Sequence, residues 1–176
     1  PIASGDREGF VVNRFFVPWL NEAVRLLEEG VASIAAIDAV AAKAFGVGMG
    51  PFALMNATGI PIAMHAARTL EDAFGAFYRP ADLLVETVSQ GDSWAVDGDA
   101  EITETSRETI VARLAGASWL AAGQLVDEEV SNFEDVDLGA RVGLRWRKGP
   151  FELANDLGLP FAMTALEGMK ARWDID

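Results

Sequence analysis

The stretch GPFALMNATGIPIAM at residues 50–64 returns as GPFELANDLGLPFAM at residues 149–163, a lag of 99. Carried upstream to residues 10–64 and 109–163, the same lag gives 17 identities in 55 positions with no insertion. The shared glycines and prolines are the most persuasive, because they fix backbone geometry rather than filling a core. We interpret the chain as an internal duplication.

The lag also pairs charged residues outside the two stretches. Arg14 pairs with Arg113, and Asp38 pairs with Asp137. Two like units can pack about a pseudo-two-fold axis with the same patch on each side, as in an isologous dimer. Two separate units on a linker are the alternative, but each would be small and its core marginal alone. We expect a fused pseudo-dimer within one chain, compatible with a monomer.

Apolar residues recur at helical spacing, and strict alternation over strand lengths is hard to find, so the predicted fold class is all-α. Helices are expected at residues 9–29, 34–45, 51–58, 61–74, 79–88, 105–129 and 133–144, after which the chain repeats the stretch at 149–163. Thr105 and Glu108 predict a capping box for the long helix. Residues 91–104, GDSWAVDGDAEITE, are rich in Gly and Asp and predict an exposed connector. The units would then be residues 1–90 and 105–176.

Composition limits the function classes. The chain has 176 residues, of which 51% are hydrophobic, and its 14 basic and 27 acidic side chains give a net charge of −13. This supports a packed core and argues against nucleic acid or an anionic membrane as partner. No apolar run reaches the roughly 18 residues of a membrane-spanning helix. Cys is absent and His occurs once, so no metal site is expected. The absence of Cys is also compatible with the reducing cytoplasm, which is the expected location.

Three stretches carry a family resemblance: GFVVNRFFVPWLNEAVRLLEEGVAS at residues 9–33, IDAVAAKAFGVGMGPFALMNATG at 37–59 and VSNFEDVDLGARVGLRWRKGPFELANDLG at 130–158. They resemble the C-terminal domain of the 3-hydroxyacyl-CoA dehydrogenases, present in tandem, with the second copy degenerate. The resemblance implies helical units like the C-terminal domain of 6-phosphogluconate dehydrogenase. Because the chain begins at Pro1 without a Met, we interpret it as a piece of a longer protein.

The resemblance also implies a reaction and partners. The family oxidises L-3-hydroxyacyl-CoA to 3-ketoacyl-CoA with NAD in fatty-acid β-oxidation. Its catalytic His, the partner Glu and the NAD fingerprint lie in an N-terminal Rossmann domain, which this sequence lacks. The chain is therefore expected to bind acyl-CoA together with that domain, to hold no cofactor itself and to be inactive alone. The Gly-rich GVGMG at residues 46–50 lies between helices and predicts a turn rather than a phosphate cradle.

Asn13 matches the Asn of the family's G-F-V-V-N-R motif, which orients the substrate's 3-oxygen and the catalytic His. A neutral amide beside that oxygen holds geometry without adding charge. The alternative is that Asn13 makes a helix–helix hydrogen bond. Ala112 stands at the equivalent position of the second copy, so that unit cannot do the same chemistry and is interpreted as structural.

Other side chains have a functional and a plain interpretation. Phe16, Pro51, Phe52 and Met55 are candidate lining of an acyl channel, although such spacing is more often core. A basic cluster is expected to pair with acidic side chains rather than to bind CoA phosphates; its members are Arg141, Arg145, Arg147 and Lys148. Two rival functions stay open: an all-α interaction or oligomerisation module, and a helical domain of another β-hydroxyacid dehydrogenase family. Those other families usually place a Lys in the first long helix of their helical part. Residues 9–29 contain no Lys, which counts against this second rival.

Overall fold

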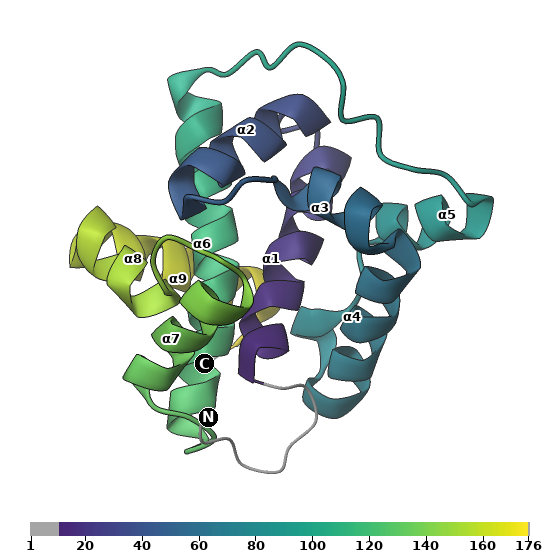
Figure 1. Ribbon diagram of the computed structural model, residues 1–176. Coiled ribbons are helices and arrows are strands. Elements are labelled where there is room, and N and C mark those ends of the chain that lie inside the picture. Colours follow the sequence, from purple (N-terminus) through teal and green to yellow (C-terminus); the bar gives the residue numbers. More distant parts are fainter. Residues whose placement is uncertain (1–10, 176) are drawn as a thin grey trace.

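The computed structural model describes residues 11–175, and the regular secondary structure within them is helical (Figure 1). This confirms the predicted all-α class. The elements are α1 (Val11–Glu28), α2 (Ile34–Phe45), α3 (Pro51–Thr58), α4 (Ile60–Phe74), the 3-10 turn η1 (Ala76–Tyr78), α5 (Asp82–Gln90), α6 (Glu104–Asp127), α7 (Phe133–Gly143), α8 (Pro150–Leu157) and α9 (Leu159–Trp173). Gly9, where the first helix was expected to begin, lies outside the described residues.

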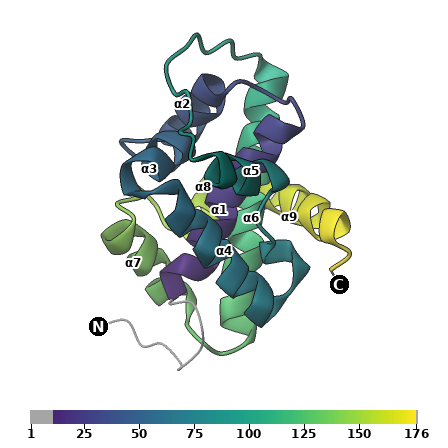
Figure 2. The same ribbon diagram turned by 90° about the vertical axis from the view of Figure 1, so that its right-hand side faces the viewer.

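The duplication is visible in the backbone. The helices α1 to α4 of the first unit correspond in order to α6 to α9 of the second, and α3 and α8 begin and end 99 residues apart, as do α4 and α9. Views from two directions place α1 beside α6 at the centre of the molecule, with α4 and α9 outside them (Figures 1 and 2). The expected pseudo-two-fold pair of helical units is therefore present.

Each unit repeats one capping device. The carboxylate of Asp38 accepts hydrogen bonds from the backbone N–H groups of Phe52 at 2.8 Å and Ala53 at 2.9 Å, at the start of α3. Asp137 does the same at the start of α8, with Phe151 at 2.8 Å and its neighbour at 3.0 Å. These bonds satisfy backbone donors that a helix start otherwise leaves free.

The core is continuous across the two units. The Trp146 ring of the second unit lies 4.8 Å from the Phe45 ring and 5.5 Å from the Trp19 ring of the first, measured between centroids. The backbone N–H of Arg147 also donates to the Phe45 carbonyl at 3.0 Å. Such shared aromatic burial stabilises the pair as one body rather than as two units on a linker.

Helix α6 runs through the middle of this core. Within the described residues it is the one helix long and apolar enough, by length and composition, to cross a membrane. However, 61% of its most apolar window is buried inside the fold, where α6 packs on α1 and α9. The apolar character of α6 is thus explained by the core.

Two local expectations were wrong. The capping box of α6 is formed by Thr103 and Ser106 rather than by Thr105 and Glu108, because the helix begins at Glu104. The connector is not uniformly exposed, since Trp94 is buried with 6% of its surface accessible. Sequence composition predicted the turns of this segment but could not show that one large side chain returns to the first unit.

Candidate functional site

Asn13 lies in the first turn of α1 and is exposed. Its side chain forms no hydrogen bond with any other part of residues 11–175. The alternative interpretation, a helix–helix hydrogen bond, therefore finds no support within these residues. The amide is available to a group that approaches this end of α1 from outside.

The next residue along the helix fixes this turn in place. Arg14 is 1% exposed, and its guanidinium stands 3.6 Å from the centroid of the Phe74 ring. Its Nε donates to the Tyr78 hydroxyl at 3.2 Å, while the other nitrogens reach Glu128 of the second unit. Burial opposes the charge, but the hydrogen bonds to Glu128 and Tyr78 outweigh it and raise the pKa of Arg14. A charged Arg14, with a hydrogen bond from each of its three side-chain nitrogens, thus anchors the backbone that carries Asn13.

The equivalent position in the second unit is apolar. Ala112 is half-buried and lies in a groove of about 320 Å³ between α6 and α9. Phe161, Ala165 and Met169 also line this groove. No amide is offered there, so the second unit lacks the one polar group that singles out the first.

The predicted acyl-channel residues are placed differently from one another. Phe16 is half-buried and stacks on the Trp19 ring at 5.9 Å. Phe52 and Met55 have no accessible surface, and Pro51 is buried. The structure thus puts Phe52, Met55 and Pro51 in the packed core of the first unit, where a substrate does not reach them, and leaves Phe16 as the partly accessible member.

The Gly-rich turn does not form a phosphate site. Gly46 ends α2 in a left-handed conformation at φ 65°, and Gly50 precedes α3. The free N–H groups at the start of α3 are taken by Asp38. A dinucleotide phosphate would need those donors. The turn at residues 46–50 therefore does not offer a phosphate cradle.

The basic cluster is partly paired. Arg141 forms an ion pair with Glu152, and Lys148 forms one with Asp156. This agrees with the expected pairing to acidic side chains for these two members. Within residues 11–175, no group of three or more His, Asp or Glu side chains could hold a metal ion.

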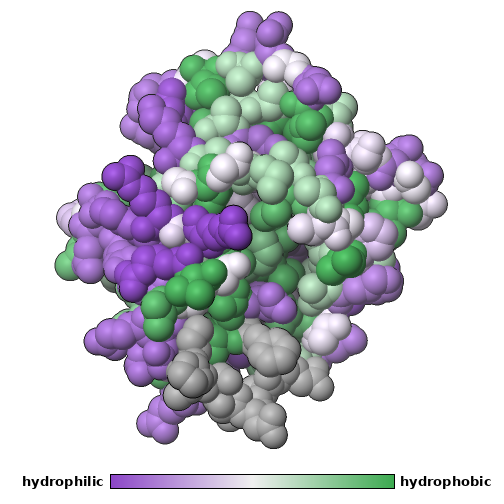
Figure 3. Space-filling view, viewed as in Figure 1, coloured by the Kyte–Doolittle hydropathy of each residue, from purple (hydrophilic) through white to green (hydrophobic). Residues whose placement is uncertain are grey.

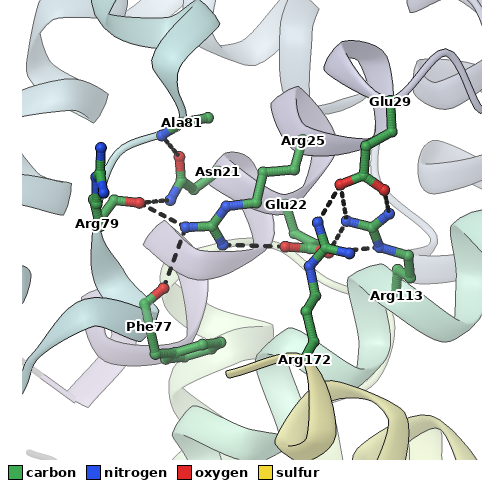
Figure 4. A network of polar contacts seen from close by, with 9 residues as sticks. All are labelled: Asn21, Glu22, Arg25, Glu29, Phe77, Arg79, Ala81, Arg113 and Arg172. Atoms are coloured by element: carbon green, nitrogen blue, oxygen red, sulfur yellow. Dashed lines mark hydrogen bonds and ion pairs between the residues drawn. The ribbon is translucent and has the colours of Figure 1, made fainter. Parts of the chain in front are cut away.

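A buried polar network between the units was missed by sequence reasoning (Figure 4). Glu22 is fully buried and accepts from Arg113 of the second unit at 2.6 Å and from Arg25 at 3.1 Å. Burial lowers the pKa of Arg25, and the charge of Glu22 partly offsets that effect. Arg113 also meets Glu29.

In the same network the Asn21 amide fixes the segment before α5. Asn21 donates to the Arg79 carbonyl at 2.7 Å and accepts from the Ala81 N–H at 2.8 Å. The sequence signal for the interface was the lag of 99, which pairs Arg14 with Arg113 and Glu29 with Glu128. Glu22 has no charged counterpart in the repeat, because Ala121 stands at the equivalent position. The repeat therefore gave no signal that Glu22 belongs to the interface.

The fold and the exposed amide define a class: a duplicated helical unit in which one copy offers a polar group at the start of its first helix. The family model of the 3-hydroxyacyl-CoA dehydrogenase C-terminal domain matches residues 9–98 and again residues 110–175. The chain belongs to this family, as the sequence resemblance predicted.

A solved structure supports the same fold. The 3-hydroxybutyryl-CoA dehydrogenase of Escherichia coli superposes with a TM-score of 0.85 at 17% sequence identity. The match covers 100% of this chain and 58% of the other. The chain therefore spans little more than half the length of that dehydrogenase.

Proposed function

We propose that the chain is the C-terminal, substrate-binding region of an NAD-dependent L-3-hydroxyacyl-CoA dehydrogenase of fatty-acid β-oxidation. It would pack against a nucleotide-binding Rossmann domain and offer Asn13 to the acyl-CoA between them. The observation that carries this proposal is the exposed Asn13 amide, which has no hydrogen-bond partner within residues 11–175, beside the buried and hydrogen-bonded Arg14. A surface amide held on a fixed helix turn suits a positioning task.

The chemistry needs such a group. Oxidation at C3 removes a hydride from carbon and a proton from the hydroxyl, so the oxygen must be held still while its charge changes. The Asn13 amide can donate to or accept from that oxygen without adding a charge. The Phe16 ring, half-buried on the same helix, would offer apolar surface to the acyl part.

The test replaces Asn13 in the enzyme that includes the nucleotide-binding domain. Asn13→Ala should lower kcat/KM for 3-hydroxybutyryl-CoA by about 100-fold, the usual cost of one oriented donor, with an unchanged Tm. Ala112→Asn is the matched control, because it adds the amide at the equivalent position and should leave the rate unchanged. An unaltered rate in Asn13→Ala would favour the rival function, a helical interaction module.

The isolated chain provides a second test. Because the family's NAD site lies in the nucleotide-binding domain, the purified 176-residue protein should not oxidise 3-hydroxybutyryl-CoA by itself. Turnover by this chain alone would contradict the proposal.

A further inference from the structure

In the first unit, the connector packs against α3. Trp94 lays its ring 5.0 Å from the Phe52 ring, measured between centroids, at an interplanar angle of 76°. The Asn56 amide then binds both backbone groups of Trp94: it donates to the carbonyl at 2.8 Å and accepts from the N–H at 2.9 Å. One aromatic contact and one two-pronged amide contact thus hold an extended segment of chain.

The second unit keeps both recognition groups, but within residues 11–175 no segment binds them as Trp94 binds the first pair. Phe151 and Asn155 stand 99 residues after Phe52 and Asn56. Asn155 is exposed, and its amide forms no hydrogen bond within the described part of the chain. It lines a groove of about 450 Å³ between α7, α8 and the start of α9.

The apolar surface of this groove is uncovered. Leu159, which lines it, is 63% exposed, whereas its counterpart Ile60 is 5% exposed. Phe133 contacts the Phe151 ring edge-to-face at 4.7 Å but remains 53% exposed, so it forms a wall of the groove rather than a cover. Apolar side chains are visible at the surface over α7 in Figure 3.

The surroundings of Phe52 and Phe151 differ in charge. Three ionisable residues line the second groove where the first unit has alanines: Glu134, Arg141 and Glu152, in place of Ala35, Ala42 and Ala53. They add one net negative charge. The connector itself is acidic, with Asp92 and Asp97 on either side of Trp94, and both are exposed. A second copy of the connector is therefore a poor match for this groove, and a segment with basic flanks is a better one.

From these contacts we infer that the groove lined by Phe151 and Asn155 binds an extended peptide of a partner protein. The peptide carries an aromatic side chain flanked by basic residues. Its aromatic ring packs on Phe151 and Leu159, and its backbone N–H and C=O bind the Asn155 amide, as Trp94 does at Asn56. Pairing of main-chain groups with a pocket for one side chain is a common mode of peptide recognition.

The probe is a fluorescein-labelled synthetic peptide based on residues 91–98, GDSWAVDG, measured by fluorescence polarisation with the full 176-residue chain. A second peptide carries Asp92→Lys and Asp97→Lys. The basic peptide should bind at least fivefold tighter than the acidic one at low salt, with the difference shrinking as salt screens the charges. Replacing the Trp of the basic peptide by Ala should abolish binding.

The matched variants are Asn155→Ala, which removes the amide, and Thr164→Ala, an exposed α9 position that lines a different groove. Asn155→Ala should weaken the basic peptide about tenfold or more, since two hydrogen bonds are lost, and Thr164→Ala should not. Circular dichroism and Tm check that both variants fold. Equal affinity of Asn155→Ala and the parent chain, or no binding of the basic peptide, overturns the proposal.

If the chain self-associates and the acidic peptide reverses this association, the groove is assigned to a second copy of the chain. That result, too, would overturn a separate partner. Sedimentation velocity with and without each peptide distinguishes the two cases.

Discussion

Arg14 donates two hydrogen bonds across the unit boundary to Glu128, at 3.2 and 3.3 Å. The reverse contact also exists, because Arg113 of the second unit pairs with Glu29 of the first. The lag of 99 converts one pair into the other. Reciprocal contacts of this kind define an isologous interface, here formed within a single chain.

The two pairs should differ in their contribution to stability. Glu128→Gln leaves the charge of Arg14 buried without its carboxylate, and we expect the free energy of unfolding to fall by about 2–4 kcal/mol. Glu29→Gln should cost less, because Arg113 keeps the buried carboxylate of Glu22. Urea unfolding followed by circular dichroism measures both.

A surface pair provides the control for this ranking. Asp156→Asn removes the partner of Lys148, and both side chains are well exposed, at 50% and 38%. Its effect should stay within about 1 kcal/mol. A loss in Glu29→Gln as large as that in Glu128→Gln would contradict the argument from the second partner.

The repeat conserves backbone shape beyond residue identity. Gly30 and Gly46 are left-handed, at φ 67° and 65°, and the equivalent Glu129 and Arg145 hold φ 55° and 58°. A side chain in that region costs about 1–2 kcal/mol, part of which glycine's greater freedom when unfolded cancels. Glu129→Gly should therefore stabilise the protein by about 0.5–1 kcal/mol, and Gly30→Ala should destabilise it by about 1 kcal/mol. Thermal unfolding of the two variants gives the sign of each change in stability. If Glu129→Gly were destabilising, contacts of the Glu129 side chain would outweigh its backbone strain.

Close approach rather than φ explains two other glycines. A Cβ at Gly149 would lie 2.2 Å from the Asp137 Cα, and one at Gly50 would lie 2.4 Å from the Asp38 Cα. Alanine at either position must displace backbone, so each substitution should destabilise by about 2 kcal/mol or more and loosen the cap of α8 or α3. Gly123→Ala is the control: nothing lies within 4 Å of the added Cβ, and the site is inside α6. It should be neutral or stabilising by up to about 1 kcal/mol, and equal losses in all three would contradict the close-approach argument.

Much of the fold was predictable because the repeat is carried by residues that fix backbone. Gly50, Pro51 and Gly59 recur at the lag of 99. Helix α3 begins and ends where it was predicted, and α8 repeats its bounds 99 residues later. The destination of Trp94 was not predictable, because its contact with Asn56 joins residues 38 apart with no local pattern. Side chains that meet only in the folded state leave no periodic signal.

The site was predictable to a smaller extent. Resemblance pointed to Asn13, and the structure shows this residue exposed. Spacing alone could not tell the half-buried Phe16 from the fully buried Phe52 and Met55, because all three are large apolar residues on helices. What decides their exposure is whether another segment covers them, and Trp94 covers Phe52.

The interface should respond to acid through Glu29. Burial alone would raise the pKa of this carboxyl, but the hydrogen bond and charge of Arg113, with Arg172 adding to them, hold it below its ordinary value. The ionised form is thus favoured in the folded state, and its stabilising effect is present above the unfolded pKa, about 4.3. That effect is lost as the pH falls through the lower, folded-state pKa. Urea midpoints should therefore separate the parent chain from Glu29→Gln at pH 7 and converge towards pH 3. Glu167→Gln, which removes an exposed α9 carboxylate, controls for the loss of one charge. If the difference in urea midpoint between the parent chain and Glu29→Gln stayed constant with pH, ionisation of Glu29 would not stabilise the interface.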